Sequence, residues 1–280
     1  MINVSDISSV LGLTFVDAVE QRRGSVLFKA RQDSEMYAVK GYDLEESDTY
    51  DRKELLEREA AITREVSPHL QQDLFVKYVR DETANNWLVT RWVDGTTLAA
   101  YTLKTVDASM GRTLRAFIET ARALNRVHKA GFLHGDVQPS HVIMADDASS
   151  PVIIDWGLAR RIDENTPYAG GFVHFTAPEI ATGMLDKSDE IAYTLAAEIY
   201  SFGAVMAFCY TGQTATDYAL STPLEDKLKL VASGTLRPLP TPVGKLDEKL
   251  TPVIQRCLAF YPENRPASLD DVIRELQSAF

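Results

Sequence analysis

Alternating apolar and polar residues mark three strands near the start of the chain. Phe15–Val19 and Ser25–Ala30 each mix β-branched or aromatic residues with polar ones, which is typical of half-buried strands. The segment Glu20–Gly24 between them is polar and ends in glycine, so it predicts a turn. Tyr37–Lys40 predicts a third strand, with Lys40 at its inner end.

A helical period replaces this alternation farther along. Apolar residues recur at helical spacing within Asp51–Val66 among many charged neighbours, and Glu59 lies in the middle of the segment. Leu74–Val79 and Trp87–Trp92 return to strand character. Turn-forming residues in Val93–Thr97 then break the pattern.

The chain changes character at this break. We therefore predict a boundary near residues 91–95, with a strand-rich lobe over residues 1–93 and a mainly helical lobe over residues 94–280. The expected helices of the second lobe are Thr113–Ala130, Asp189–Tyr210, Pro223–Ser233, Asp247–Phe260 and Leu269–Phe280.

Capping residues support several of these helix ends. Gly131 and Gly212 follow two of the helices, and Ser268 precedes the last one as an N-cap. Residues 161–175 combine polar residues with proline and glycine, so we expect an exposed loop there.

Two short apolar runs in the second lobe predict a hairpin that carries chemistry. Val142–Met144 and Val152–Ile154 flank a segment of turn formers, with Asp136 before the first run and Asp155 after the second. A hairpin of this length brings both carboxylates to one end of the strand pair. One carboxylate can then orient an attacking hydroxyl while the other holds a metal ion on a phosphate, which suits phosphoryl transfer.

Composition limits the range of partners. The 280 residues carry a net charge of −11, which argues against a general nucleic-acid binder. The sequence has no apolar run of about 18 residues, no cleavable signal and no lipidation motif, so it predicts a cytoplasmic protein without a membrane partner. Cys209 and Cys257 lie in apolar helical contexts and are interpreted as small buried residues.

Over residues 12–280, the order of these pieces resembles the eukaryotic-type protein kinase family, mainly its Ser/Thr members. The resemblance implies an α+β bilobal fold, with an antiparallel sheet and one helix in the first lobe and a mainly helical second lobe. It also implies ATP and Mg²⁺ as cofactors, with Mn²⁺ as an alternative ion, and a protein substrate or regulated partner that the sequence does not identify.

The first lobe carries the motifs that the family uses to bind nucleotide. Tyr37-Ala38-Val39-Lys40 is similar to the Val-Ala-Ile-Lys strand, which implies that Lys40 contacts the α- and β-phosphates and pairs with Glu59. Leu88–Val93 is similar to the hinge beside adenine, which would make Thr90 the gatekeeper. The ATP-binding positions implied by the resemblance are Gly24, Val26, Ala38, Lys40, Glu59, Thr90, Arg91 and Val93.

The second lobe carries the motifs associated with catalysis. His134-Gly135-Asp136 stands where the family has His-Arg-Asp, which implies Asp136 as catalytic base, with Gln138 two residues on. Asp155-Trp156-Gly157 stands for Asp-Phe-Gly, which implies Asp155 as a metal ligand. Ala177-Pro178-Glu179 closes the activation segment, and Glu179 would pair with Arg265. Glu198–Gly203 resembles the helix that supports the catalytic loop.

Departures from the family pattern leave the activity open. Gly24 is the single glycine of the expected phosphate-binding loop, and Gln138 replaces a lysine expected near the γ-phosphate. His141 replaces the asparagine that takes a second metal ion; imidazole suits Mn²⁺ or transition metals better than Mg²⁺, so His141 is either a ligand or a hydrogen-bonded loop residue. Phe172 replaces the threonine that ties the activation segment to the catalytic aspartate in Ser/Thr kinases.

Gly135 bears on regulation, because the family's arginine at this position receives a phosphate on the activation loop. Without it, phosphorylation of Thr166 or Tyr168 has no evident receiver, so we expect activity that does not require loop phosphorylation.

The sequence is therefore compatible with three functions. They are a working protein kinase, a pseudokinase that acts as a nucleotide-binding scaffold, and a small-molecule phosphotransferase. The last is kept because His134-Gly135-Asp136 also resembles the aminoglycoside and choline kinases.

Overall fold

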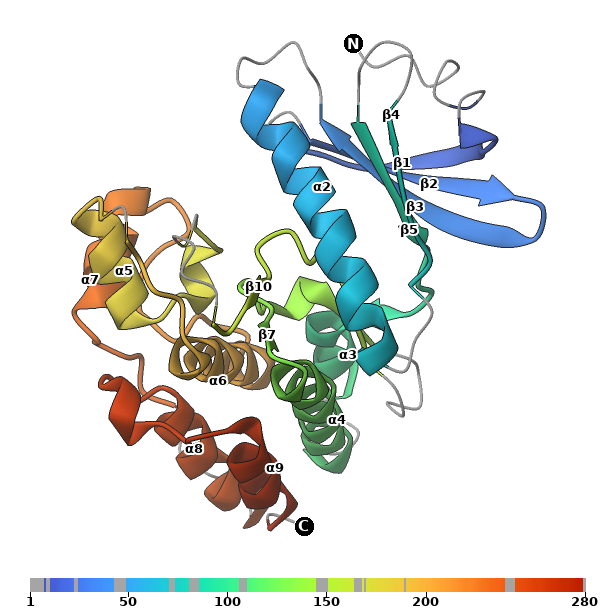
Figure 1. The fold of residues 1–280 in the computed structure, drawn as a ribbon. Helices are drawn as coiled ribbons and strands as arrows, with labels where there is room; N and C mark the ends of the chain where they lie inside the picture. The colour runs from blue at the N-terminus through green and yellow to red at the C-terminus, as the bar shows by residue number, and fades with distance from the viewer. Residues whose placement is uncertain are drawn as a thin grey trace. The chain divides into compact units, whose positions relative to one another are not determined.

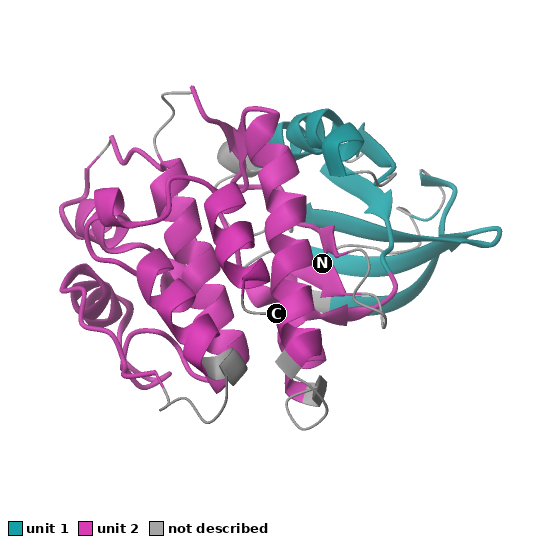
Figure 2. Ribbon diagram, turned by 90° about the horizontal axis from the view of Figure 1, so that it is seen from below, with its two compact units in different colours: residues 1–93 teal, residues 94–280 magenta. Residues whose placement is uncertain are grey.

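The computed structural model divides the chain into two compact units, Met1–Val93 and Asp94–Phe280 (Figure 2). The structure describes residues 8, 11–22, 25–42, 49–70, 74–80, 86–105, 110–144, 151–163, 168, 170–188, 190–239 and 245–278. None of the helices in these ranges is both long enough and apolar enough to cross a membrane.

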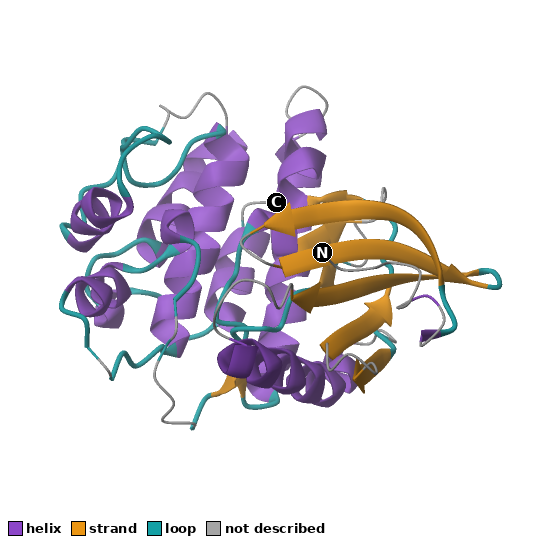
Figure 3. Cartoon of the chain, turned by 90° about the horizontal axis from the view of Figure 1, so that it is seen from above, coloured by secondary structure: helices purple, strands orange, loops and turns teal. Residues whose placement is uncertain are grey.

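The first unit is built on a five-stranded antiparallel sheet, drawn in orange in Figure 3. Its strands are β1 (Thr14–Arg22), β2 (Ser25–Gln32), β3 (Glu35–Tyr42), β4 (Val76–Arg80) and β5 (Asn86–Arg91), in the spatial order β1-β2-β3-β5-β4. The predicted strands are present, although β4 begins two residues later than expected. Phe75 has a φ of 39°, which is incompatible with strand geometry, so β4 starts after it.

Helix α2 (Thr49–Val66) packs against β4 and β5, and the alternation of the strands separates two apolar faces. Leu88 of β5 meets Leu56 and Ala60 of α2 on one face. Trp87 and Val89, which point the other way, join a cluster with residues of β2 and β3. The expected helix Asp51–Val66 is thus confirmed.

The second unit is mainly helical (Figure 1). Its α-helices over the described residues are α3 (Leu98–Thr105), α4 (Met110–Lys129), α5 (Pro178–Leu185), α6 (Leu195–Thr211), α7 (Leu224–Ala232), α8 (Lys245–Cys257) and α9 (Leu269–Gln277). The sequence prediction missed α3 and α5, which at eight residues each are too short to show a clear apolar period.

Helix α6 forms the centre of this unit and is buried along nearly its whole length. The expected start at Asp189 is wrong: Thr194 is extended, and its side-chain oxygen accepts a hydrogen bond from the backbone N–H of Ala197 at 3.2 Å, so the helix begins at Leu195. The expected end is confirmed, because Gly212 has a φ of 72° and terminates the helix in the left-handed region. Ser268 likewise caps α9, as expected.

The expected hairpin is confirmed as β8 (Val142–Met144) paired with β9 (Val152–Ile153). Strand β6 (Thr96–Thr97) adds to its outer edge. A separate pair joins β7 (Phe132–Leu133) to β10 (Arg160–Arg161). These two small sheets hold the ends of the loops that carry the candidate site.

The expectation of an exposed loop over residues 161–175 is wrong for three aromatic or apolar side chains. Tyr168, Val173 and Phe175 are buried, with exposed fractions of 5–7%. Val173 packs with Leu228 of α7, and Tyr168 stacks on Tyr193 with ring centroids 4.7 Å apart. The polar residues and glycines of the segment indicated exposure, because local sequence pattern does not report contacts with residues far away in the chain.

Candidate active site

The Asp136 carboxylate is held by hydrogen bonds on both of its oxygens. Its loop leaves β7 and enters the short 3-10 helix η2 (Pro139–His141). The Gln138 side-chain amide donates to Oδ2 at 2.9 Å, and the backbone N–H of Phe172 donates to Oδ1 at 3.2 Å. The carboxylate is therefore held in one orientation. Phe172 lacks the hydroxyl of the threonine expected at this position, but its backbone N–H makes the hydrogen bond to Asp136 instead.

Glu198 anchors the same loop from helix α6, as the resemblance implied. Its side chain is only 1% exposed and accepts three hydrogen bonds: from the N–H of His134 at 3.0 Å, from the N–H of Gly135 at 2.8 Å, and from His128 Nε2 at 2.6 Å. Burial alone would raise the pKa of Glu198. The hydrogen bonds from His128 and from the backbone N–H of His134 lower this pKa below its ordinary 4.5 instead. Glu198 is thus an ionised acceptor that fixes the backbone just before Asp136.

His134 packs beneath the loop as a neutral ring. Its Nε2 donates to the carbonyl of Ile154 at 3.0 Å, while its Nδ1 accepts from the N–H of Asp136 at 3.2 Å. The Trp156 ring lies against it, with centroids 4.7 Å apart. Burial, together with the nearby His141, lowers the pKa of His134 below its ordinary 6.5. A second ring proton would also break the bond to Asp136.

His141 lies between the two candidate carboxylates. Its Nδ1 donates to the carbonyl of Asp136 at 3.0 Å, which leaves Nε2 to accept from the Gln138 amide at 3.0 Å. The same Nε2 is 3.4 Å from Oδ2 of Asp155. Asp155 itself has a φ of 64°, an uncommon left-handed conformation for a residue other than glycine. The structure therefore brings together Asp136, Gln138, His141 and Asp155. The hairpin predicted the two aspartates, and the family resemblance predicted Gln138 and His141.

The donor set of this site suits a magnesium ion only in part. Asp155 offers carboxylate oxygens, and its side chain is 39% exposed. These properties suit Mg²⁺, which proteins usually bind through one or two carboxylates together with substrate phosphates. The Nε2 lone pair of His141 is engaged by Gln138. Within the described ranges, no group of three or more His, Cys, Asp or Glu side chains has the arrangement of a self-sufficient metal site. His141 as a metal ligand stays a prediction.

The first unit contains the predicted lysine–glutamate pair. Lys40 Nζ of β3 donates to both oxygens of Glu59 on α2, at 3.1 and 2.8 Å. Glu59 is almost fully buried, whereas the Lys40 side chain is partly exposed.

The other predicted nucleotide-binding residues are distributed over the same sheet. Ala38 of β3 lies opposite Thr90 of β5, and Val26 of β2 is buried in the core of the sheet. Arg91 pairs with Glu35, and Val93 follows β5 outside regular structure. Gly24 lies outside the described residues. The roles of all these positions stay predictions.

A structural ion pair expected from the resemblance is also present. Arg265, whose side chain is fully buried, donates to both carboxylate oxygens of Glu179 at 2.6 and 2.7 Å. It donates as well to the carbonyls of Ala196, Ala259 and Phe260. This residue ties the start of α5 to the segment after α8.

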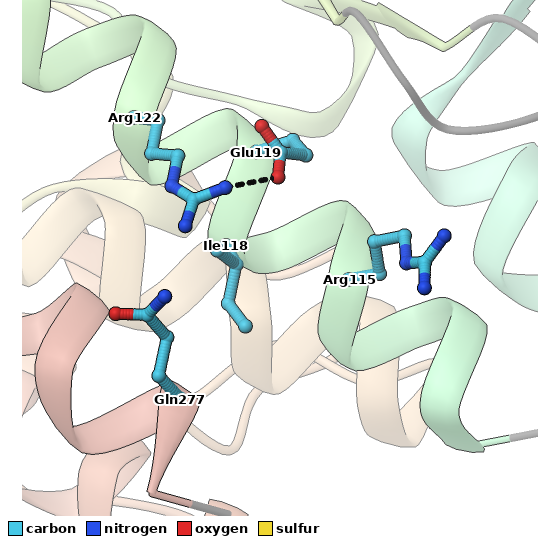
Figure 4. Close-up of a pocket in the computed structure, with 5 residues that line it drawn as sticks. All are labelled: Arg115, Ile118, Glu119, Arg122 and Gln277. Atoms are coloured by element: carbon cyan, nitrogen blue, oxygen red, sulfur yellow. Dashed lines mark hydrogen bonds and ion pairs between the residues drawn. The ribbon is translucent and has the colours of Figure 1, made fainter. Parts of the chain in front are cut away.

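A cavity of about 470 Å³ lies on α4 beside the end of α9 (Figure 4). Its lining residues are Arg115, Ile118, Glu119, Arg122 and Gln277. Glu119 and Arg122 pair with each other at 2.5 Å, and none of the predicted site residues lines this cavity.

Sequence reasoning missed two residues that support the loop carrying Asp136, one through Glu198 and one by direct contact. His128 was not singled out, although a histidine on the otherwise apolar face of a helix could have been questioned. Tyr168 was named only as a possible phosphorylation site, yet its hydroxyl donates to the carbonyl of Gly135 at 2.8 Å. No local signal in the sequence reveals that contact.

Comparison with known proteins identifies the class. The family model described as the protein kinase domain matches residues 22–276, so the chain belongs to the protein kinase family. The fold agrees, because the kinase PK-1 of Cydia pomonella granulovirus superposes over 97% of both chains with a TM-score of 0.69 at 17% identity.

Bacterial serine/threonine kinases are among its similar relatives. A probable serine/threonine-protein kinase of Clostridium acetobutylicum is 28% identical over 69% of this chain and 28% of its own length. PknK of Mycobacterium tuberculosis is 30% identical over 59% of this chain and 14% of its own length, and AfsK of Streptomyces coelicolor is 30% identical over 66% and 22%. The chain thus spans a seventh to little more than a quarter of these relatives.

Proposed function

We propose that this protein is an ATP-dependent kinase that transfers the γ-phosphoryl group to a serine or threonine hydroxyl of a protein. The observation that carries the proposal is the Lys40–Glu59 ion pair at 2.8 Å, because kinases require this pair for phosphoryl transfer. The names of the bacterial relatives favour serine and threonine as acceptors.

Each candidate residue has a separate task in this proposal. Lys40 binds the α- and β-phosphates, and Glu59 fixes the direction of its ammonium group. Asp136 accepts the proton of the attacking hydroxyl, and the Gln138 amide and the Phe172 N–H hold its carboxylate in one orientation. Asp155, with His141 as a second candidate ligand, would hold Mg²⁺ or Mn²⁺, which supplies charge neutralisation on the phosphates when bound.

The test is incubation of the purified protein with γ-labelled ATP, Mg²⁺ or Mn²⁺, and a generic protein substrate. Asp136→Asn should abolish label transfer, whereas Asp33→Asn, an exposed aspartate in the β2–β3 turn, should leave it unchanged. Phosphoamino-acid analysis identifies the acceptor. Transfer that persists in Asp136→Asn would exclude Asp136 as the base.

The metal is examined with a separate variant. If His141 is a ligand, His141→Asn should shift the preference from Mn²⁺ towards Mg²⁺, since an amide oxygen suits the harder ion. An unchanged ratio of the two activities would assign His141 to the hydrogen-bond network of the loop.

A pseudokinase is the second candidate, and one observation favours it. Gln138 is neutral, and its side-chain amide donates hydrogen bonds to Asp136 and His141. The positive charge of the lysine that the family carries at this position, near the γ-phosphate, is therefore missing. A nucleotide-induced thermal shift without turnover in either metal would support this scaffold function over catalysis.

A further inference from the structure

Tyr168 connects the activation segment to the catalytic loop. Its hydroxyl donates to the carbonyl of Gly135 at 2.8 Å, and Gly135 immediately precedes Asp136. The tyrosine is 7% exposed, and its own N–H donates to the carbonyl of Ile191 at 3.0 Å. It is therefore fixed at both ends, by its main chain and by its hydroxyl.

The ring of Tyr168 is held by an aromatic pair and a buried cation. It stacks on Tyr193 at an interplanar angle of 20°. The guanidinium of Arg160 lies 5.1 Å from the centroid of Tyr168 and 5.8 Å from that of Tyr193, and Arg160 is only 4% exposed. A cation over two electron-rich faces in a desolvated position stabilises the stack. Arg160 is thus directed at the tyrosine rings.

Two glycines make room for this arrangement. A Cβ on Gly171 would lie 2.0 Å from the Tyr168 hydroxyl oxygen, so a side chain at 171 would displace the hydroxyl. A Cβ on Gly135, which has a φ of 78°, would lie 2.2 Å from the carbonyl oxygen of Leu158. The arginine that the family carries at position 135 does not fit this backbone.

We propose that Tyr168 is a positioning residue, whose hydroxyl holds the Gly135 carbonyl and so keeps Asp136 in register without a phosphate on the activation segment. This inference rests on the proposed kinase activity and extends it, because it names what orders the segment. The hydroxyl acts through the loop and does not contact the reacting atoms.

The chemistry of the hydroxyl supports a permanent contact. Burial and the nearby Asp136 carboxylate raise the pKa of Tyr168 far above its ordinary 10, so the group stays protonated and donates. A phosphate on the same oxygen could not remain 2.8 Å from a carbonyl oxygen, because it removes the donor and adds negative charge. Phosphorylation of Tyr168 would therefore release the segment.

The experiment compares Tyr168→Phe with Tyr193→Phe in the full chain. Both variants keep the ring and remove one hydroxyl, but the Tyr193 hydroxyl faces Ser201 at 3.4 Å and not the catalytic loop. Tyr168→Phe should lower kcat about fivefold, the equivalent of one net hydrogen bond of about 1 kcal/mol, with the KM for ATP unchanged. Tyr193→Phe should keep kcat within about twofold. Equal kcat in wild type and both variants would overturn the proposal.

Gly171→Ala provides an independent route to the same contact. It should lower kcat as Tyr168→Phe does, and the double variant should lose little more than either single one, because both changes remove the same hydrogen bond. Full additivity of the two losses would overturn the proposal. Phosphatase treatment of the wild type should leave its rate unchanged, and a loss of activity with phosphate found on Tyr168 would contradict it.

Hydrogen exchange separates this inference from the proposed function. The N–H of Phe172, which bonds to Asp136, should exchange about fivefold faster in Tyr168→Phe and at the wild-type rate in Tyr193→Phe. If wild type transfers no phosphate, the kinase proposal fails, but this comparison still decides the role of Tyr168. Equal exchange rates in both variants would show that Tyr168 does not position the loop.

Discussion

Replacing Glu198 with glutamine tests how the catalytic loop is anchored. The amide keeps the size of the side chain but offers one acceptor oxygen in place of two. Oε1 accepts from His134 N–H and His128 Nε2, and Oε2 accepts from Gly135 N–H. The least costly orientation keeps the oxygen at the Oε1 position, which sets an amide NH₂ against the Gly135 N–H.

The expected cost follows from these three bonds. A buried N–H left without an acceptor costs about 1–3 kcal/mol, and each of the two remaining bonds loses about 1 kcal/mol when its acceptor is no longer charged. Glu198→Gln should therefore lower the free energy of unfolding by about 3–5 kcal/mol at neutral pH. Because domains are stable by about 5–15 kcal/mol, the variant should fold with a loosened loop.

The pH dependence has a defined sign. The pKa of Glu198 is lowered in the folded protein, so its contribution is fully present above the unfolded carboxyl pKa and is lost as pH falls through the folded value, below 4.5. Glutamine does not titrate. The difference in unfolding free energy between the wild type and Glu198→Gln should therefore shrink at acid pH.

Urea unfolding at neutral and acid pH measures this difference, and exchange of the Gly135 N–H reports the loop directly. Glu248→Gln, on the exposed face of α8, is the matched control and should change stability by less than about 0.5 kcal/mol. The reasoning is refuted if Glu198→Gln matches this control and the Gly135 N–H exchanges at the wild-type rate.

Three further predictions concern other polar contacts. Lys40→Met removes both hydrogen bonds to the buried Glu59 carboxylate, so we expect a loss of about 2 kcal/mol in unfolding free energy and no thermal shift on adding ATP; an undiminished shift would contradict the role of Lys40. Arg265→Lys replaces a fully buried fork that binds Glu179 through two nitrogens, and should cost about 2–4 kcal/mol by denaturant titration, whereas a cost under 1 kcal/mol would argue against the pair. The lowered pKa of His134 means that the unfolded state binds more protons below pH 6.5. The free energy of unfolding should thus rise with pH in that window by up to about 1.4 kcal/mol per pH unit. His134→Asn should reduce this dependence on pH; an equal dependence in both proteins would show that another group is responsible.

Local pattern was enough to predict the five strands of the first unit, the longer helices and the hairpin, but not the two-residue strands β6, β7 and β10. Period-2 and period-3.6 alternations report which face is buried, and these are properties of neighbouring residues. Spacing between motifs then predicted the Lys40–Glu59 and Arg265–Glu179 pairs through the family resemblance, and both are present.

Contacts made by the main chain or across long sequence distances could not be predicted. Phe172 contributes its backbone N–H to Asp136, a group that every residue except proline carries and that leaves no trace in the sequence. The burial of Tyr168 depends on Tyr193 and Arg160, and its polar neighbours suggested exposure instead. The short helix α5 is likewise defined by packing against α7 more than by its own period.

The tie between Phe172 and Asp136 has a consequence for how this protein can change. Its ring is 48% exposed, and the grip on the carboxylate belongs to the peptide bond. Any residue except proline, which has no backbone N–H, could stand at position 172 and still donate this hydrogen bond to Asp136. Substitution at position 172 can thus change the surface beside Asp136 while this hydrogen bond is kept.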